Sequence, residues 1–219
     1  MSEWTDGDVA SGERLQRELA PHVRRRPLSP APETVAGAAF AFADERVVQA
    51  AAVLVRRADL SVIESATDSG QCRPYRAGLL AMSVGEAVRA AVLELPRPDA
   101  LMLLGHGIAH PRRCGLASHL GLRTGLPTVG LADRPLVGDC DEPDAPRGSW
   151  TPLEHESETI GAALRTQNEV RPLIVSVGHL VTLEDAIDLV LACAPRYRWP
   201  EPIREARRLA REAISEASE

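Results

Sequence analysis

The sequence predicts an α/β protein built on one mixed sheet, in which three antiparallel strands are followed by parallel strands and helices flank the sheet. Three observations predict this fold class. Three β-type runs are separated by short polar intervals that resemble hairpin turns, and a short apolar run then lies between two helical stretches, as a buried parallel strand does. In addition, 44% of the 219 residues are hydrophobic, which is enough to bury the core of one domain.

The N-terminal elements follow from hydrophobic spacing and turn residues. Residues 1–12 are polar and are expected to be flexible, so the single domain is expected to span residues 13–219. Leu15 and Leu19 are four residues apart and predict an amphipathic helix over residues 11–23, which a Pro-rich linker follows. The three antiparallel strands are expected at residues 34–42, 47–55 and 60–67.

Helices and apolar runs alternate in the rest of the chain. The helices are expected at residues 86–95, 116–122, 182–194 and 201–215, and the strands at residues 100–104, 128–131 and 173–177. Residues 139–150 are acidic and rich in proline, and they predict a surface loop. Because strands that alternate with helices run parallel, the complete pattern is that of a ribonuclease H-like sheet.

Composition and charge exclude several classes of function. All 25 basic residues are arginine, which excludes Schiff-base chemistry, attachment of pyridoxal phosphate and a P-loop lysine. The net charge of −6 indicates that binding to long nucleic acids is weak. The four cysteines lie far apart, so neither a zinc ribbon nor a redox motif is expected. The pattern contains no membrane span and no signal peptide, and a cytoplasmic protein is therefore expected.

One segment carries a family motif. Residues 105–121 read GHGIAHPRRCGLASHLG and resemble the signature of the endonuclease V family, which pairs GHG with a downstream HPRR, a glycine and ASHxG. The segments VAGAAF, Pro74-Tyr75, PTVGLA and YRWPEP match further family motifs in order along the chain. The resemblance implies a ribonuclease H-like fold and a Mg²⁺-dependent nuclease that cleaves 3′ to deoxyinosine in DNA or inosine in RNA.

The chain departs from the family at positions that the resemblance assigns to the metal. The family aspartate on the first strand falls on Ala39, and the aspartate before GHG falls on Leu104. The family glutamate falls on Val84, although a small gap would bring Glu86 into its place. At best one metal carboxylate remains, and Mg²⁺ requires several oxygen ligands. No metal site, no cofactor and no Mg²⁺-dependent cleavage are therefore expected.

Two other positions near the implied metal site differ in charge from the family. Asp133 stands where the family has a lysine, and Arg207 stands where the family often has histidine or aspartate. Asp133 could form a new two-carboxylate site with Glu86, or it could be an exposed residue that ends a strand. His106 and His110 are further candidates for acid–base chemistry without a metal. The predicted catalytic residues are His106, His110, Glu86 and Asp133.

The implied base pocket, by contrast, matches the family motif. Pro74-Tyr75 resembles the wedge loop of the family, which encloses an extruded base together with GHG and HPRR. Glycines approach that base closely, and a histidine hydrogen-bonds it. The residues predicted to bind a ligand are Tyr75, Gly78, Gly105, Gly107, His110, Arg112, Arg113 and Gly115. The alternative is that these residues only shape the loop and that the two arginines are ion-paired.

The sequence thus predicts an endonuclease V-like protein that has lost Mg²⁺-dependent nuclease activity. It is expected to keep a pocket for a purine-like or other small planar ligand. A small molecule is then the main partner, and the protein acts as a binding protein or as a repurposed, metal-independent enzyme. The alternative is an active nuclease that cleaves 3′ to inosine with unorthodox metal ligands.

Overall fold

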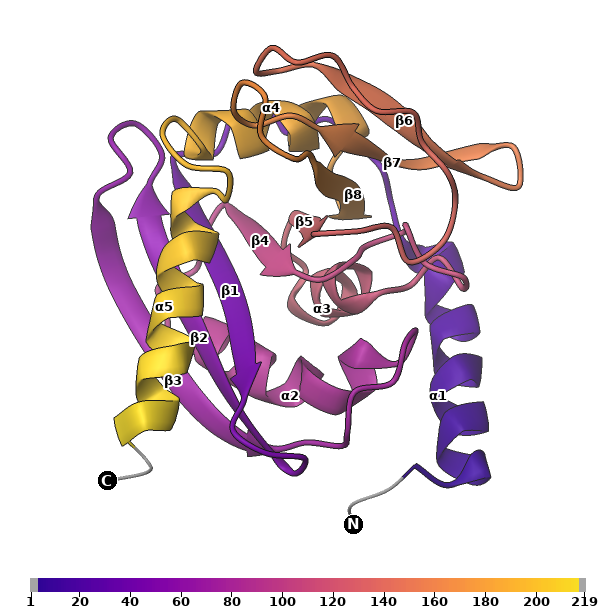
Figure 1. Cartoon of the computed structure of the whole chain (residues 1–219). Helices are drawn as coiled ribbons and strands as arrows, with labels where there is room; N and C mark the ends of the chain where they lie inside the picture. Colours follow the sequence, from indigo (N-terminus) through magenta and orange to yellow (C-terminus); the bar gives the residue numbers. More distant parts are fainter. Residues whose placement is uncertain (1–3, 217–219) are drawn as a thin grey trace.

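The computed structural model describes residues 4–216, which form one eight-stranded mixed sheet with helices on both faces (Figure 1). The strands are β1 (Thr34–Phe42), β2 (Val47–Arg56), β3 (Val62–Gln71), β4 (Ala100–Leu104), β5 (Thr128–Ala132), β6 (Trp150–His155), β7 (Glu158–Leu164) and β8 (Leu173–His179). The helices are α1 (Asp6–Leu19), η1 (Ala20–His22), α2 (Leu80–Leu93), α3 (Leu116–Thr124), α4 (Leu183–Cys193) and α5 (Glu201–Glu216).

The sheet has the strand order β3-β2-β1-β4-β5-β8-β7-β6. The antiparallel pairing of β1, β2 and β3 and the parallel pairing of β1, β4 and β5 confirm the predicted fold class. The last predicted strand, β8, differs from the parallel strands before it because it pairs antiparallel with β5. The hairpin β6–β7, which the sequence pattern did not predict, lies between β5 and β8 in the chain, and the antiparallel connection from β7 reverses the chain into β8.

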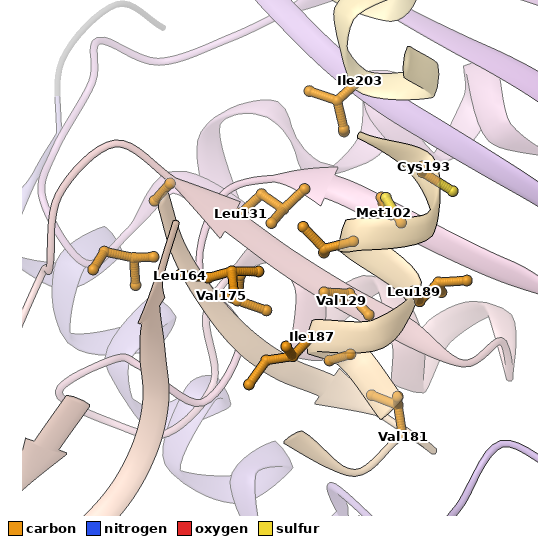
Figure 2. Close-up of a cluster of buried hydrophobic side chains, with 14 of the residues drawn as sticks. Met102, Val129, Leu131, Leu164, Val175, Val181, Ile187, Leu189, Cys193 and Ile203 are labelled. Atoms are coloured by element: carbon orange, nitrogen blue, oxygen red, sulfur yellow. The ribbon is translucent and has the colours of Figure 1, made fainter. Parts of the chain in front are cut away.

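Two separate hydrophobic cores cover the two faces of the sheet. Residues of α4 and α5 pack on one face, where Figure 2 shows Ile187 and Leu189 over β5 and β8. Residues of α2 and α3 pack on the other face. Because side chains alternate along a strand, Ala39 lies in the α4–α5 core while its neighbour Ala38 lies in the α2–α3 core.

The N-terminal helix begins earlier than its leucine spacing predicts. The side chain of Thr5 accepts a hydrogen bond from the backbone N–H of Asp8, and the Asp8 side chain accepts one from the backbone of Thr5, so a capping box starts α1 at Asp6. The expected boundary at residue 12 between a flexible start and the domain therefore falls inside a helix. No helix within residues 4–216 is both long and apolar enough to cross a membrane.

Candidate functional site

The GHG motif lies at the carboxyl end of β4, where the chain crosses β8 in backbone contact. The N–H of Gly107 donates to Ser176 Oγ at 2.8 Å, and the N–H of Ile108 donates to the carbonyl of Val177 at 2.8 Å. A Cβ on Gly107 would lie 1.9 Å from that carbonyl oxygen. Glycine is therefore required at this position for packing against β8.

His110 is almost completely buried, with 2% of its surface exposed, and both of its ring nitrogens have partners. The backbone N–H of Arg112 donates to Nδ1 at 3.1 Å, and Nε2 lies 3.0 Å from the carbonyl oxygen of Gly78. These partners require a neutral ring with the proton on Nε2. Burial, followed by the charge of Arg112, lowers the pKa of His110 to about 4. The ring thus holds the wedge loop and has no nitrogen free for proton transfer.

Arg112 joins the same network from the HPRR segment. Its guanidinium donates to Gly78 O at 2.7 Å, to Gln16 Oε1 at 2.7 Å and to Glu13 Oε1 at 3.2 Å. The amide of Gln16, which is fully buried, donates to Gly78 O at 3.0 Å. Gln16 was not predicted, because the spacing of Leu15 and Leu19 pointed to a different face of α1.

Arg113 reaches the β6–β7 hairpin. Its Nε donates to Glu158 at 2.8 Å, and another nitrogen lies 3.1 Å from Nδ1 of His155. Both guanidiniums of HPRR therefore have partners within the protein, which agrees with the ion-paired alternative. Ligand binding by Arg112 and Arg113 stays a prediction, and it requires that a ligand displace these partners.

Several predicted ligand-binding residues do surround one cavity, which has a volume of about 30 Å³. The cavity is lined by Gln16, Tyr75, Gly78, Leu80, Ala81, His106, His110, Gly115, Leu116 and Leu136. Gly105, Gly107, Arg112 and Arg113 do not line it. Its volume is about that of one water molecule, so a purine enters only if the cavity opens. Tyr75 is the most exposed residue of the lining, at 62%.

The four predicted catalytic residues do not form one constellation. His106 lines the cavity, and its Nε2 lies 2.9 Å from the carbonyl oxygen of Arg134. Glu86 is exposed on α2, where it pairs with Arg89 and with Arg123 of α3. Asp133 follows β5 and pairs with Arg198 at 2.7 Å. Glu86 and Asp133 thus have separate partners, and the structure does not bring them together as a two-carboxylate site.

The positions of the two family aspartates lie side by side. The parallel register pairs Ala38 of β1 with Leu103 of β4, so the next residues along, Ala39 and Leu104, are neighbours. Ala39 is fully buried, and Leu104 packs against the same core. No group of three His, Cys, Asp or Glu side chains within residues 4–216 has a geometry that could hold a metal ion.

Two buried histidines predict a loss of stability in mild acid. Burial is the largest cause that lowers the pKa of His110 and of His119 from 6.5 to about 4. The unfolded chain therefore binds more protons than the native state below pH 6.5, so the free energy of unfolding decreases as the pH falls from about 6.5 towards 4. Each ring contributes at most about 3 kcal/mol to this loss.

Urea unfolding at pH 7 and pH 4.5 tests this expectation. We expect His119→Leu to reduce the loss of stability between the two pH values, because the substitution removes one titrating ring. His22→Gln, at an exposed position of η1, is the control and should leave the loss unchanged. An equal loss in wild type and His119→Leu would contradict the prediction.

The strand order and the strand directions define a ribonuclease H-like α/β protein. Its histidine-lined cavity lies at the carboxyl end of β4. The chain belongs to the endonuclease V family, whose sequence model matches residues 17–208. Endonuclease V of Streptomyces avermitilis is 47% identical over 209 residues, which cover 93% of this chain and 91% of that relative. A crystal structure of Endonuclease V from the same organism has a TM-score of 0.90 at 45% identity, and the match covers 96% of this chain and 94% of that chain.

A third comparison corrects the expected partner. A crystal structure of Endonuclease V from Ciona intestinalis contains a 24-mer DNA with an inosine followed by a ribo-adenosine. It has a TM-score of 0.84 at 23% identity, and the match covers 97% of this chain and 100% of that chain. Together with the family match and the 47% identity to Endonuclease V of Streptomyces avermitilis, this structure contradicts the expectation of a small molecule as the main partner with only weak binding to nucleic acid. The shared name of the relatives also favours an endonuclease over a protein without nuclease activity.

Proposed function

We propose that this chain is a nucleic-acid-binding member of the endonuclease V family that recognises an inosine-type base but does not cleave the strand with Mg²⁺. The observation that carries the proposal is the pair Ala39 and Leu104 on adjacent strands. Their methyl and isobutyl groups occupy the two positions that the family motif assigns to aspartates.

The side chains around these positions do not fit Mg²⁺. Mg²⁺ binds oxygen ligands in octahedral geometry and is usually held by carboxylates. Val84, at the position of the family glutamate, is fully buried among apolar residues. The negative charge of Asp133 is already opposed by Arg198. Arg207 brings a further positive charge close enough to Asp133 for the two to interact. A cation would therefore meet apolar groups and guanidiniums at this edge of the sheet.

The wedge loop supports recognition of a base. Tyr75 is exposed at the mouth of the cavity that His106 and His110 also line. Two contacts hold the residues just before Tyr75 against the N-terminal segment. Trp4 Nε1 donates to Pro74 O at 2.9 Å, and Arg73 pairs with Asp8 of α1 at 2.9 Å. A base extruded from a strand can stack on the exposed ring and enter the cavity once the cavity opens. Of the relatives, Endonuclease V of Ciona intestinalis is solved with inosine-containing DNA.

The second candidate function is cleavage of the strand with other metal ligands. The observation that favours it is the 47% identity to Endonuclease V of Streptomyces avermitilis over nearly the whole chain. Both candidates share recognition of the base and differ only in the chemistry that follows. The cytoplasmic location stays a prediction under either candidate.

Fluorescence anisotropy with labelled single-stranded oligonucleotides tests the proposal. We expect at least about fivefold tighter binding to a strand with one inosine than to the same strand with adenosine, because hydrogen bonds to a base edge contribute about 1–3 kcal/mol of discrimination. Tyr75→Ala should weaken binding to both strands at least about fivefold, because stacking on an aromatic ring contributes about 1–3 kcal/mol whichever base it holds. Trp150→Ala, which removes an exposed aromatic ring on β6, is the matched control and should leave both affinities unchanged. Equal affinity of the wild type for the two strands would overturn the proposal.

A further inference from the structure

An arginine-rich groove of about 580 Å³ runs along α5 on the side of Trp199. We call it the α5 groove, and its lining is Trp199, Arg204, Arg207, Arg208, Arg211 and Glu212. The four arginines fall within two turns of one helix, although the whole chain carries a net charge of −6. The groove is therefore a local concentration of positive charge on an acidic protein.

Two of the four guanidiniums are neutralised by neighbours on the same helix. Arg204 pairs with Glu201 at 2.7 Å and with Glu205 at 2.6 Å. Arg208 pairs with Glu205 at 2.9 Å and with Glu212 at 2.6 Å. Because carboxylates already neutralise these two side chains, neither gains much by binding another anion.

The other two guanidiniums make no direct ion pair, although Asp133 lies close enough to Arg207 for a longer-range attraction. Neither Arg207 nor Arg211 makes an ion pair or a side-chain hydrogen bond with any residue between 4 and 216. The two lie four residues apart on the same side of the helix, where like charges repel. Arg207 is half-buried with its guanidinium 4.6 Å from the centre of the Trp199 ring. Burial, and then the charge of Arg211, lowers the pKa of Arg207. An anion placed between the two would relieve this repulsion.

The position of the groove connects it with the site at the end of β4. Trp199 and Leu104 pack against the same hydrophobic core, which also contains Ala39. Leu104 immediately precedes Gly105 and the loop whose residues line the cavity. Asp133 directly follows β5, and it lies close enough to Arg207 to interact with it. Because β5 pairs parallel with β4, with Leu131 beside Leu104, Arg207 lies near the same edge of the sheet as the end of β4.

We propose that the α5 groove binds the backbone phosphates of a nucleic-acid strand through Arg207 and Arg211. The planar guanidinium matches the geometry of a phosphate group and donates two parallel hydrogen bonds to it. Trp199 holds one face of the Arg207 guanidinium and leaves its edge for the phosphate. The inference rests on the proposed function, because the strand in the groove is the one that presents its base to the cavity.

Salt titrations of binding to a single-stranded oligonucleotide test the proposal, with charge-matched variants of the same helix. We expect Arg207→Gln and Arg211→Gln each to weaken binding several-fold at ~0.15 M salt and to reduce the slope of log K against log salt by about 0.7. Arg208→Gln removes the same charge from a paired side chain, and it should change affinity and slope by less than half as much. Because Arg211 is exposed, its substitution is not expected to disturb folding even if that of Arg207 does.

The outcomes separate this inference from the proposed function. Equal effects of Arg208→Gln and Arg211→Gln, or no effect of Arg211→Gln, would overturn the phosphate site. If the inosine preference persists in that case, base recognition stands without the groove. If the arginine variants behave as expected but inosine and adenosine strands bind equally, the groove stands and base recognition fails. Absence of any binding by the wild type would overturn both.

Discussion

In Mg²⁺ or Mn²⁺ the purified protein is expected to leave an inosine-containing oligonucleotide intact, at the background rate of the strand alone. Ala39 and Leu104 occupy the positions where metal-holding carboxylates are needed, and they carry no oxygen. A bound metal contributes roughly 5 kcal/mol of transition-state stabilisation in such reactions. Its loss therefore lowers the cleavage rate about 10³–10⁴-fold relative to a nuclease that binds the metal. A denaturing gel over a time course measures the rate.

Endonuclease V of Streptomyces avermitilis, at 47% identity, is the natural positive control for this assay. Strand cleavage by this protein that EDTA abolishes would contradict the prediction. It would instead establish the second candidate function, in which other side chains hold the metal.

The double variant Ala39→Asp/Leu104→Asp tests the reason for that result by a measurement other than activity. It places two carboxylates side by side on β1 and β4, where their mutual repulsion destabilises the fold unless a cation binds. Millimolar Mg²⁺ should therefore raise the Tm of the double variant by several degrees and leave the Tm of the wild type unchanged. A Mg²⁺-dependent rise for the wild type would show that the natural chain already binds the ion.

Gly107→Ala is expected to unfold the protein or to destabilise it by more than about 4 kcal/mol. The added Cβ would lie 1.9 Å from the carbonyl oxygen of Val177 and 2.5 Å from its carbonyl carbon. Both atoms belong to the backbone of the buried strand β8, so neither can move away without breaking the pairing of β8 with β5. Thermal unfolding followed by circular dichroism measures the effect.

Gly85→Ala is the matched control in the same protein. Gly85 lies inside α2, and a Cβ there would meet only Leu116 Cδ1 at 4.0 Å. Alanine should stabilise the helix by about 0.5–1 kcal/mol, because it loses less conformational freedom than glycine on folding. A soluble Gly107→Ala protein with the Tm of the wild type would show that the loop after β4 tolerates a side chain.

The cavity was predictable from the sequence only in part. The motif residues Gly78, His110 and Gly115 do line one cavity, because the motif encodes the loops that meet there. Gln16 lines it too, yet nothing in the spacing of α1 identified it. Helical periodicity locates an apolar face, whereas the side of α1 that packs against the wedge loop is fixed by polar partners, the guanidinium of Arg112 among them.

By itself, the sequence determined β1, β2 and β4 almost to the residue, because local apolar runs and the turns between them suffice for that. It also determined that positions 39 and 104 carry no carboxylate, which no packing can change. Only the tertiary structure decided the direction of β8 and the presence of the β6–β7 hairpin, since both depend on pairing between distant segments. It also decided which charges are directly paired: Arg113 pairs with Glu158, 45 residues away, while Arg207 makes no direct ion pair within residues 4–216. An ion pair depends on distance in space, and local sequence patterns carry no information about that distance.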